Sequence, residues 1–507
     1  MTDVRSSLPS TCEITIPDPG SKPEEIFPNR WSHTLISNPY AIVTPSSISD
    51  IIATIQYATS QNLKLIPSGG ARACFVPITP DVIYLDLRNF SSFHLDEERS
   101  EVSIGGGCIS GPLLKGLAEK GYYTAAPNSN GVGMTGALLG GLNHPLGGLH
   151  GMGIDMVKSF TIVPFSMPDG GALKPVIVDR ESVGEEKKLW DVLRGAGHGM
   201  GVVVSVTMDV FPIAKLDLDE GNKVWQRTLV FGLDALETAI EAYLTLQSDV
   251  PPEMNFFLGF MRAPPTAPRP GAPVVLLSIS FFGPSKKAEK AAVITFSEEV
   301  LAKTVNATTT LTPFADIHNA LDPLNKPGGF KELHGAFVKS ITGSSLARVF
   351  NSFLSFTNDN PTRSGSSIIF PASNTAKSES LAAQGDFYNP RDRGIYVQIK
   401  TSYPTADGKI EADAFAKEVH GIAREGDRGF GRKDWAFANN MVEGMSLQDI
   451  YTPDQIREIH RVNHIWNKGN VGWCPTTEEW LWYTKSREKG AKPGTILQEV
   501  VEGQHAS

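Results

Sequence analysis

Residues 131–153, GVGMTGALLGGLNHPLGGLHGMG, constrain the fold of this chain more than any other segment. Nine of these twenty-three residues are glycine, and neither a helical nor a strand period survives along them. A backbone with so few side chains lets a large group approach closely, most often a dinucleotide phosphate or the edge of a flavin. The segment therefore predicts a cofactor cradle.

The bulk composition is that of a globular protein with more than one domain. The chain has 507 residues, 41% of them hydrophobic, which exceeds what one core normally supports. Its formal net charge is −9 without any long run of lysine or arginine, so we expect neither nucleic acid nor a membrane as partner. The amino terminus has no apolar signal-peptide core and no apolar run could span a bilayer, which predicts a cytoplasmic protein.

The first two-fifths of the chain alternate predicted strands with predicted helices. Ser47 can cap a helix over residues 48–58, and a second helix over 111–121 is closed by glycine. Short apolar runs between these helices predict strands at residues 63–67, 81–87, 101–105 and 159–165. This alternation favours an α+β or α/β cofactor domain.

Beyond Pro212 the pattern changes to strand, strand, helix, which favours an antiparallel sheet with helices on one face. We expect strands at 255–260 and 274–282, a helix at 233–246 and a long helix that begins near Ser285. Residues 394–403 alternate cleanly. One face of this strand carries Ile395, Val397 and Ile399 and should pack, which leaves the other face, with Tyr396, Gln398 and Lys400, free to line a site.

Three segments resemble, in order and spacing, the PCMH-type FAD-binding domain of the vanillyl-alcohol-oxidase superfamily, and in particular the berberine-bridge-enzyme-like oxidases. They are the loop IPSGGA at residues 66–71, the glycine-rich segment, and the stretch LWDVLRGAGHGMGVVVSVTMDVFP at residues 189–212. The resemblance implies that FAD contacts Ser68, Gly69, Gly70, Ala71, Arg72, Ser129, Val132, Gly133, Gly136, Gly140, Gly141, Asp155, Gly201 and Val203.

The resemblance also implies an architecture and an activity. The fold would be two-lobed and α+β, with an FAD-binding domain over residues 1–215 that is rejoined by residues 450–507. An antiparallel-sheet substrate domain would span residues 216–449. Such a protein would be an FAD-dependent oxidoreductase that oxidises a small organic substrate, in specialised metabolism.

The chain departs from the family at both positions that bond covalently to the flavin. Ala71 stands where the family has the linking histidine and Ser129 where it has the linking cysteine, so we expect FAD to be bound without a covalent link. Cys74 and Cys108 lie elsewhere in the register and are interpreted as small buried residues. Leu142 replaces the third glycine of the family's glycine triplet.

The family's catalytic tyrosine motif is also changed, because the best match is Phe437-Ala-Asn-Asn440. Gln398 matches the family glutamine near the reactive ring. Tyr396, with the cation Lys400 two positions further along the same face, is a candidate proton carrier, and the alternative is a half-buried strand face. His144 is a candidate near the ring, and its alternative is hydrogen bonding within the loop.

Two other classes of function stay open at this level. The missing linkages and tyrosines favour, as an alternative, a redox-neutral cyclase or isomerase on the same fold, and a third reading is a non-catalytic ligand-binding relic. We expect no metal, because His460 and His464 lack the glutamate of a zinc motif and a third ligand. The sequence does not predict the substrate, the electron acceptor or the oligomeric state.

Overall fold

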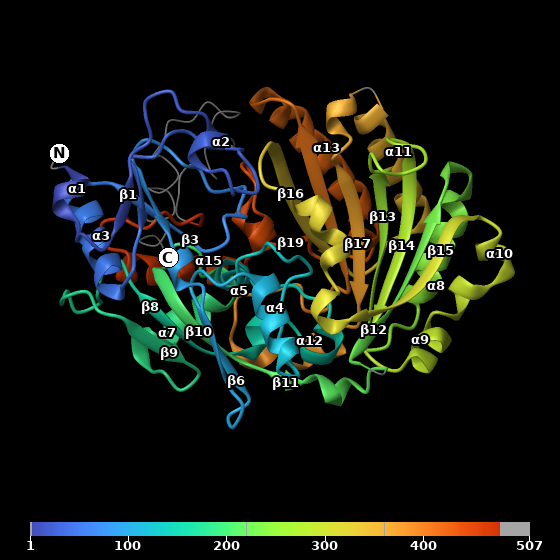
Figure 1. Cartoon of the computed structure of the whole chain (residues 1–507), viewed down its shortest axis with the longest axis horizontal. Helices are drawn as coiled ribbons and strands as arrows, with labels where there is room; N and C mark the ends of the chain where they lie inside the picture. Colours follow the sequence, from blue (N-terminus) through green and yellow to red (C-terminus); the bar gives the residue numbers. More distant parts are fainter. Residues whose placement is uncertain (1–2, 220, 359, 477–507) are drawn as a thin grey trace, which may run out of the picture.

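The computed structural model describes residues 3–219, 221–358 and 360–476. Two lobes lie side by side, and each is built on β-sheet (Figure 1). The first lobe carries a four-stranded and a five-stranded sheet, and the second carries one eight-stranded sheet. The α+β class is therefore confirmed. In the described part of the chain no helix is both long enough and apolar enough to cross a membrane.

The four-stranded sheet opens the first lobe, with the order β1-β2-β4-β3. Its strands are β1 (Glu13–Thr15), β2 (Ala41–Thr44), β3 (Lys64–Ser68) and β4 (Val82–Asp86). Helix α3 (Ile48–Gln61) connects β2 to β3, and each of these two strands pairs with β4 in parallel. The Ser47 hydroxyl accepts a hydrogen bond from the Asp50 amide at 3.2 Å, as the predicted cap requires. Apolar residues of α3 pack on this sheet, so the predicted helix is confirmed.

The five-stranded sheet is antiparallel, with the order β5-β6-β10-β8-β9. Its strands are β5 (Phe93–Asp96), β6 (Glu101–Gly105), β8 (Val157–Val163), β9 (Val176–Asp179) and β10 (Val202–Asp209). The other elements of this part are α1 (Val4–Ser7), α2 (Pro23–Ile26), α4 (Ser110–Glu119), β7 (Tyr122–Tyr123), α7 (Gly184–Ala196) and β11 (Phe211–Pro212). The strands and the helix predicted here are confirmed to within a few residues.

The glycine-rich segment contains more regular structure than its pattern indicates. Residues Met134–Leu139 form helix α5 and residues Gly147–His150 form helix α6. Met134 and Leu138 are buried in the core of the lobe, which supplies the packing that stabilises so short a helix. Packing against the rest of the lobe therefore stabilises helix α5, although its sequence lacks a helical period.

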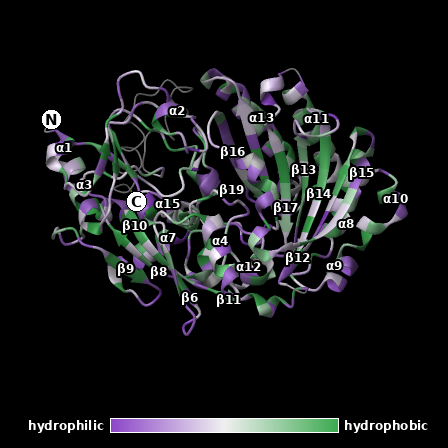
Figure 2. Cartoon of the chain, viewed as in Figure 1, coloured by the Kyte–Doolittle hydropathy of each residue, from purple (hydrophilic) through white to green (hydrophobic). Residues whose placement is uncertain are grey.

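The second lobe is an antiparallel sheet with the order β15-β12-β14-β13-β17-β18-β16-β19. The strands are β12 (Lys223–Phe231), β13 (Met254–Arg262), β14 (Pro273–Phe281), β15 (Thr304–Pro313), β16 (Phe330–Val338), β17 (Ser367–Ser373), β18 (Ile395–Tyr403) and β19 (Trp435–Ala436). Helices α8 (Leu236–Gln247), α11 (Gly343–Asn358) and α13 (Lys409–Ala423) share a hydrophobic core with one face of the sheet, whose strands carry green hydrophobic bands in Figure 2. The opposite face of the sheet is turned toward the first lobe.

The long helix predicted near Ser285 is wrong. Helix α9 ends after Ser285–Ala291, and a 3₁₀ turn separates it from α10 (Glu298–Leu301). The break falls where Thr295 donates its hydroxyl hydrogen bond to the Ala292 carbonyl at 2.7 Å, while Ser297 caps the next helix. The remaining helices of this lobe are α12 (Ala376–Ser380) and α14 (Glu425–Gly429).

The chain returns to the first lobe near its end. Helix α15 (Pro453–Trp466) packs beside α7, and the Leu65 amide donates to the Val471 carbonyl at 2.8 Å. These contacts involve the part of the predicted rejoining segment that the structure describes, and residues 477–507 of that segment lie outside the described residues. The domain boundaries at 215 and 450 stay predictions.

Candidate cofactor and active site

A large cavity lies between the two lobes, with a volume of about 1190 Å³. This exceeds the roughly 300–1,000 Å³ of ordinary small-molecule pockets, so it has room for a dinucleotide together with a second ligand. The first lobe contributes the loops around residues 66–76, 127–145 and 198–203. The second lobe contributes the exposed face of its sheet, through β13, β14, β16, β17 and β18.

Two of the glycine loops touch each other backbone to backbone beside this cavity. A Cβ atom added to Gly70 would lie 2.2 Å from the Gly133 nitrogen, and one added to Gly133 would lie 2.5 Å from the Gly70 nitrogen. Glycine is therefore required here by the packing of one loop on the other, and not only by the approach of a cofactor. At Gly136, which also lines the cavity, an added Cβ would meet no described atom within 4 Å beyond its chain neighbours and the backbone of its own helix. The slot beside the loops is open.

Several buried polar groups around the cavity have no hydrogen-bond partner among the residues that the structure describes. They are Ser129 Oγ, Thr135 Oγ1, His144 Nδ1 and His198 Nδ1, in residues that all line the cavity. Buried polar atoms are normally hydrogen-bonded, so such a set indicates a ligand that supplies the missing partners. The phosphates, ribityl hydroxyls and ring heteroatoms of FAD offer both donors and acceptors, and the residues present therefore fit this cofactor.

Ala71 and Ser129, which the sequence resemblance aligns with the family's covalent-link positions, carry side chains that cannot bond to a flavin carbon in the family's manner. Ala71 has only a methyl group, and Ser129 carries a hydroxyl in place of a thiol. Cys74 also lines the cavity, but its Sγ accepts a hydrogen bond from the Leu333 amide at 3.5 Å and burial raises its pKa to about 11. A thiol with so high a pKa is a poor nucleophile.

The structure brings most of the predicted cofactor residues to the cavity wall. Those that line it are Ser68, Gly69, Gly70, Ala71, Arg72, Ser129, Val132, Gly133, Gly136, Gly201 and Val203. Gly140, Gly141 and Asp155 do not, because they pack behind the wall.

These three residues support the wall from behind. A Cβ on Gly140 would meet the amide of Asn439, and one on Gly141 would meet the ring of Tyr388. Asp155 accepts hydrogen bonds from Arg391 at 2.8 and 3.0 Å, and from the Met152 amide at 2.7 Å. Arg391 also binds Asp386, so this buried ion cluster joins the glycine-rich segment to the second lobe.

Strand β18 presents its two faces as the sequence predicts. Ile395, Val397 and Ile399 belong to the core on the helix side, whereas Tyr396, Gln398 and Lys400 line the cavity. Tyr403, at the end of the strand, falls on the core face. Its hydroxyl donates to Glu332 at 3.0 Å, away from the cavity.

Tyr396 and Lys400 are not brought together as one proton-carrying pair. Four residues of strand separate them by about 13 Å, at about 3.3 Å per residue. The Tyr396 hydroxyl donates instead to Asn440 Oδ1, and its ring stacks on Phe337 with centroids 4.9 Å apart. Burial raises the Tyr396 pKa above its usual value, so the phenol stays protonated. The role of Asn440 was missed because it depends on contact between distant segments.

Lys400 is the titratable group of this face whose pKa moves toward neutrality. Burial and, to a smaller extent, the nearby Arg72 charge lower the Lys400 pKa to about 8. The pKa of His144 shifts away from neutral pH, because burial lowers it to about 3. Its Nε2–H donates to the Gly151 carbonyl at 3.0 Å, which leaves Nδ1 as a neutral acceptor.

Sequence reasoning also missed residues of the sheet face that line the cavity. These include Asn255 and Phe257 on β13, Leu276 on β14, and Ser367 and Ile369 on β17. Their strands were partly predicted, but the signal that could have found these residues, the choice of face, requires the order of the strands in the sheet.

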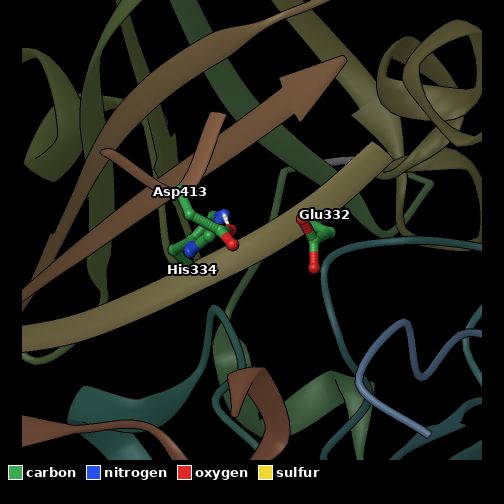
Figure 3. Close-up of side chains that lie close together, drawn as sticks. All are labelled: Glu332, His334 and Asp413. Carbon is green, nitrogen blue, oxygen red and sulfur yellow. Dashed lines mark ion pairs between the residues drawn. The ribbon is translucent and has the colours of Figure 1, made fainter. Parts of the chain in front are cut away.

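One acidic cluster outside the cavity has a composition suited to a metal. Glu332, His334 and Asp413 place one ligand atom each within 4.8 Å of one another (Figure 3). The Lys409 ammonium already bridges Glu332 at 3.2 Å and Asp413 at 2.6 Å. Burial and this neighbouring charge lower the pKa of His334 to about 3. The lysine therefore supplies the positive charge that these groups need.

Comparison with known proteins identifies an FAD binding domain within the first lobe. Residues 39–171 match the FAD binding domain family. The FAD-linked oxidoreductase OXR1 of Pyricularia oryzae is 23% identical over 442 residues, which cover 85% of this chain and 82% of that protein. The FAD-linked oxidoreductase azaL of Aspergillus niger is 20% identical and covers 90% of this chain and 94% of its own length.

The fold recurs among solved structures. The BBE-like 1 protein of Physcomitrella patens superposes with a TM-score of 0.72 at 16% identity, over 92% of this chain and 97% of that chain. The cavity, the glycine loops and these comparisons agree: the chain is an FAD-linked oxidoreductase that carries an FAD binding domain, and its fold is that of the BBE-like structure.

Proposed function

We propose that this chain holds FAD without a covalent bond and uses it to oxidise a small organic substrate in the specialised metabolism of the cytoplasm. The observation that carries the proposal is the pairing of an open cavity with Ala71 and Ser129 at the linking positions. The FAD-linked oxidoreductases that it resembles in Pyricularia and Aspergillus support a role in fungal metabolism.

The cofactor would be held by the first lobe. The amides of Gly70, Ala71 and Arg72 donate to no acceptor in the described part of the chain, so they are available to phosphate oxygens. Ser129 and His144 would supply hydrogen bonds from the neighbouring loop. When bound, FAD supplies hydride acceptance, which none of the side chains can provide.

The substrate would lie on the sheet face of the second lobe. Phe257, Leu276 and Ile369 offer an apolar floor, while Gln398 and Lys400 offer polar contacts beside it. Asn440 accepts the hydrogen of the Tyr396 hydroxyl, so the phenol oxygen is left to accept a hydrogen bond from a substrate hydroxyl or amine. Gln398 would orient the oxidised carbon.

Turnover of the natural substrate is the direct test. Metabolites are compared in cells with and without this protein, and the compound that accumulates in its absence is added to the purified enzyme without oxygen. We expect the visible absorbance of the flavin to bleach as the compound is oxidised. Product formation with no net change in oxidation state would instead show a redox-neutral reaction and overturn the proposal.

Gln398→Ala gives a second readout. Because Gln398 lies on the substrate side, the variant should lose most turnover and keep its flavin content. Equal loss of turnover and of flavin would place Gln398 with the cofactor and contradict its assigned role.

A further inference from the structure

The cavity is lined by positive charge although the chain as a whole is acidic. Arginine and lysine side chains line it, and within residues 3–219, 221–358 and 360–476 no aspartate or glutamate does. The formal net charge of the whole chain is −9. The cations concerned are Arg30, Arg72, Arg262, Lys326 and Lys400. A confined surface of one sign concentrates ligands of the opposite sign.

The three arginines of this set are already engaged with the protein. Arg30 donates to the Ala73 carbonyl at 2.5 Å, Arg72 to Asn325 Oδ1 at 2.8 Å, and Arg262 to Thr357 Oγ1 at 3.0 Å. Lys326 is exposed at the rim. Lys400 is half-buried, and it has neither a hydrogen-bond acceptor nor an ion-pair partner among the described residues.

The register of the sheet fixes where the Lys400 side chain stands. Lys400 pairs with Leu333 on β16 and with Ser367 on β17, and both of these residues line the cavity. Gln398, the next residue on the same face, pairs with Ile369. Lys400 thus belongs to the substrate side of the cavity, on a strand that carries none of the glycine loops.

An ammonium group in such a position is costly without an anion beside it. Arg72 and Lys331 are the charged groups near it, and both repel it. The surfaces around it are apolar, through Leu333 and Ile369, with Phe257 and Leu276 on the strands beyond. A ligand that relieves this arrangement carries an anionic oxygen on an apolar body.

We propose that Lys400 binds an anionic oxygen of an aromatic substrate, a carboxylate or a phenolate, and thereby selects for substrates of this class. The inference rests on the proposed function, because it takes the sheet face to be the substrate side. Lys400 acts here as a specificity-determining residue. Arg72 and the glycine loops are left to the cofactor.

Isothermal titration calorimetry of the purified holoenzyme tests the inference. The probes are benzoate and 4-nitrophenolate as the two kinds of oxyanion, and benzamide as the neutral analogue of benzoate. We expect at least one oxyanion to bind about tenfold or more tightly than benzamide. The tighter of the two oxyanions identifies which acid the site prefers.

Variants of the protein test whether Lys400, and not another group, causes the preference for the anion over benzamide. Lys400→Met should bind benzoate and benzamide with similar affinity, and Lys400→Arg should keep a preference for the anion. Lys417→Met is the matched control, because Lys417 is exposed on α13 and does not line the cavity, and it should behave as the unaltered protein. All variants should retain their flavin.

Three results would overturn the inference. They are equal affinity of the unaltered protein for the oxyanions and benzamide, an anion preference that persists in Lys400→Met, and loss of FAD from Lys400→Met, which would place Lys400 at the cofactor. A protein purified without any flavin would refute the proposed function instead. Calorimetry does not depend on flavin absorbance, so the anion preference is still measured in that case.

Discussion

The first lobe brings to the cavity two glycine loops that pack on each other through their backbones, whereas the second lobe lines it with residues from five strands of one sheet. Around Gly70 and Gly133 the loops approach so closely that a single Cβ atom would overlap the neighbouring main chain. On β18 the chemistry lies instead in Tyr396, Gln398 and Lys400. A site built from backbone tolerates little change of residue type, while a site built from side chains can change its ligand without a change of fold. We therefore expect the first lobe to determine the cofactor and the second lobe to determine the substrate.

Gly70→Ala should have the largest effect, because the added Cβ would lie 2.2 Å from the Gly133 nitrogen and one of the loops would have to move. We expect a loss of more than about 4 kcal/mol in the free energy of unfolding, together with loss of flavin. Gly136→Ala is the control. The Cβ atom that this variant adds meets no neighbouring side chain or loop within 4 Å. The free energy of unfolding of the flavin-free protein, measured by thermal unfolding, should therefore change by less than about 1 kcal/mol. Equal unfolding temperatures for the two variants would break the comparison between the lobes.

Arg391→Ala should come next, because it leaves the buried carboxylates of Asp155 and Asp386 without their cation. Breaking a buried pair in this way costs about 3–5 kcal/mol. Arg348→Ala removes an exposed pair with Glu425 and should cost less than about 1 kcal/mol. Chemical denaturation of both variants gives the two values, and similar losses would show that the cluster does not join the lobes.

The affinity for benzoate should fall as the pH rises through about 8. The Lys400 pKa is lowered to about 8 by burial and by Arg72, so its positive charge is present below that pH and is lost above it. Benzoate stays ionised throughout this range. Above the pKa its dissociation constant should rise about tenfold per pH unit, and this rise should vanish in Lys400→Met. A dissociation constant that is flat between pH 7 and pH 9 would disprove the titration.

The smallest expected effect is the difference in stability between two variants of Leu142. These variants compare a backbone effect with a side-chain effect at a single residue. Leu142 replaces a family glycine and adopts a φ of +52°, in the region that favours glycine, while its side chain is buried. Both Leu142→Ala and Leu142→Gly lose the burial. Glycine also relieves the backbone strain, so Leu142→Gly should be the more stable of the two by about 1 kcal/mol. A more stable alanine variant would show that the strain is not significant.

The sequence predicts the backbone part of the site better than the side-chain part. The glycine loops and the alternation along β18 are local patterns, and most of their predicted residues line the cavity, whereas Gly140, Gly141 and Asp155 pack behind its wall. The contact of Tyr396 with Asn440 and the ion cluster of Arg391 with Asp155 join residues far apart in the chain, so no local pattern could predict them. Even for the glycines the local pattern misses a cause, because the contact between Gly70 and Gly133 depends on how two distant loops pack.

The state of the flavin after denaturation tests the central claim most directly. The purified protein is precipitated with acid, the supernatant is analysed for FAD, and the intact mass of the polypeptide is measured. Because the sequence resemblance places Ala71 and Ser129 at the linking positions, we expect free FAD in the supernatant and a polypeptide mass equal to that of the unmodified chain. A polypeptide whose mass includes the flavin, or a protein that contains no flavin at all, would contradict the account.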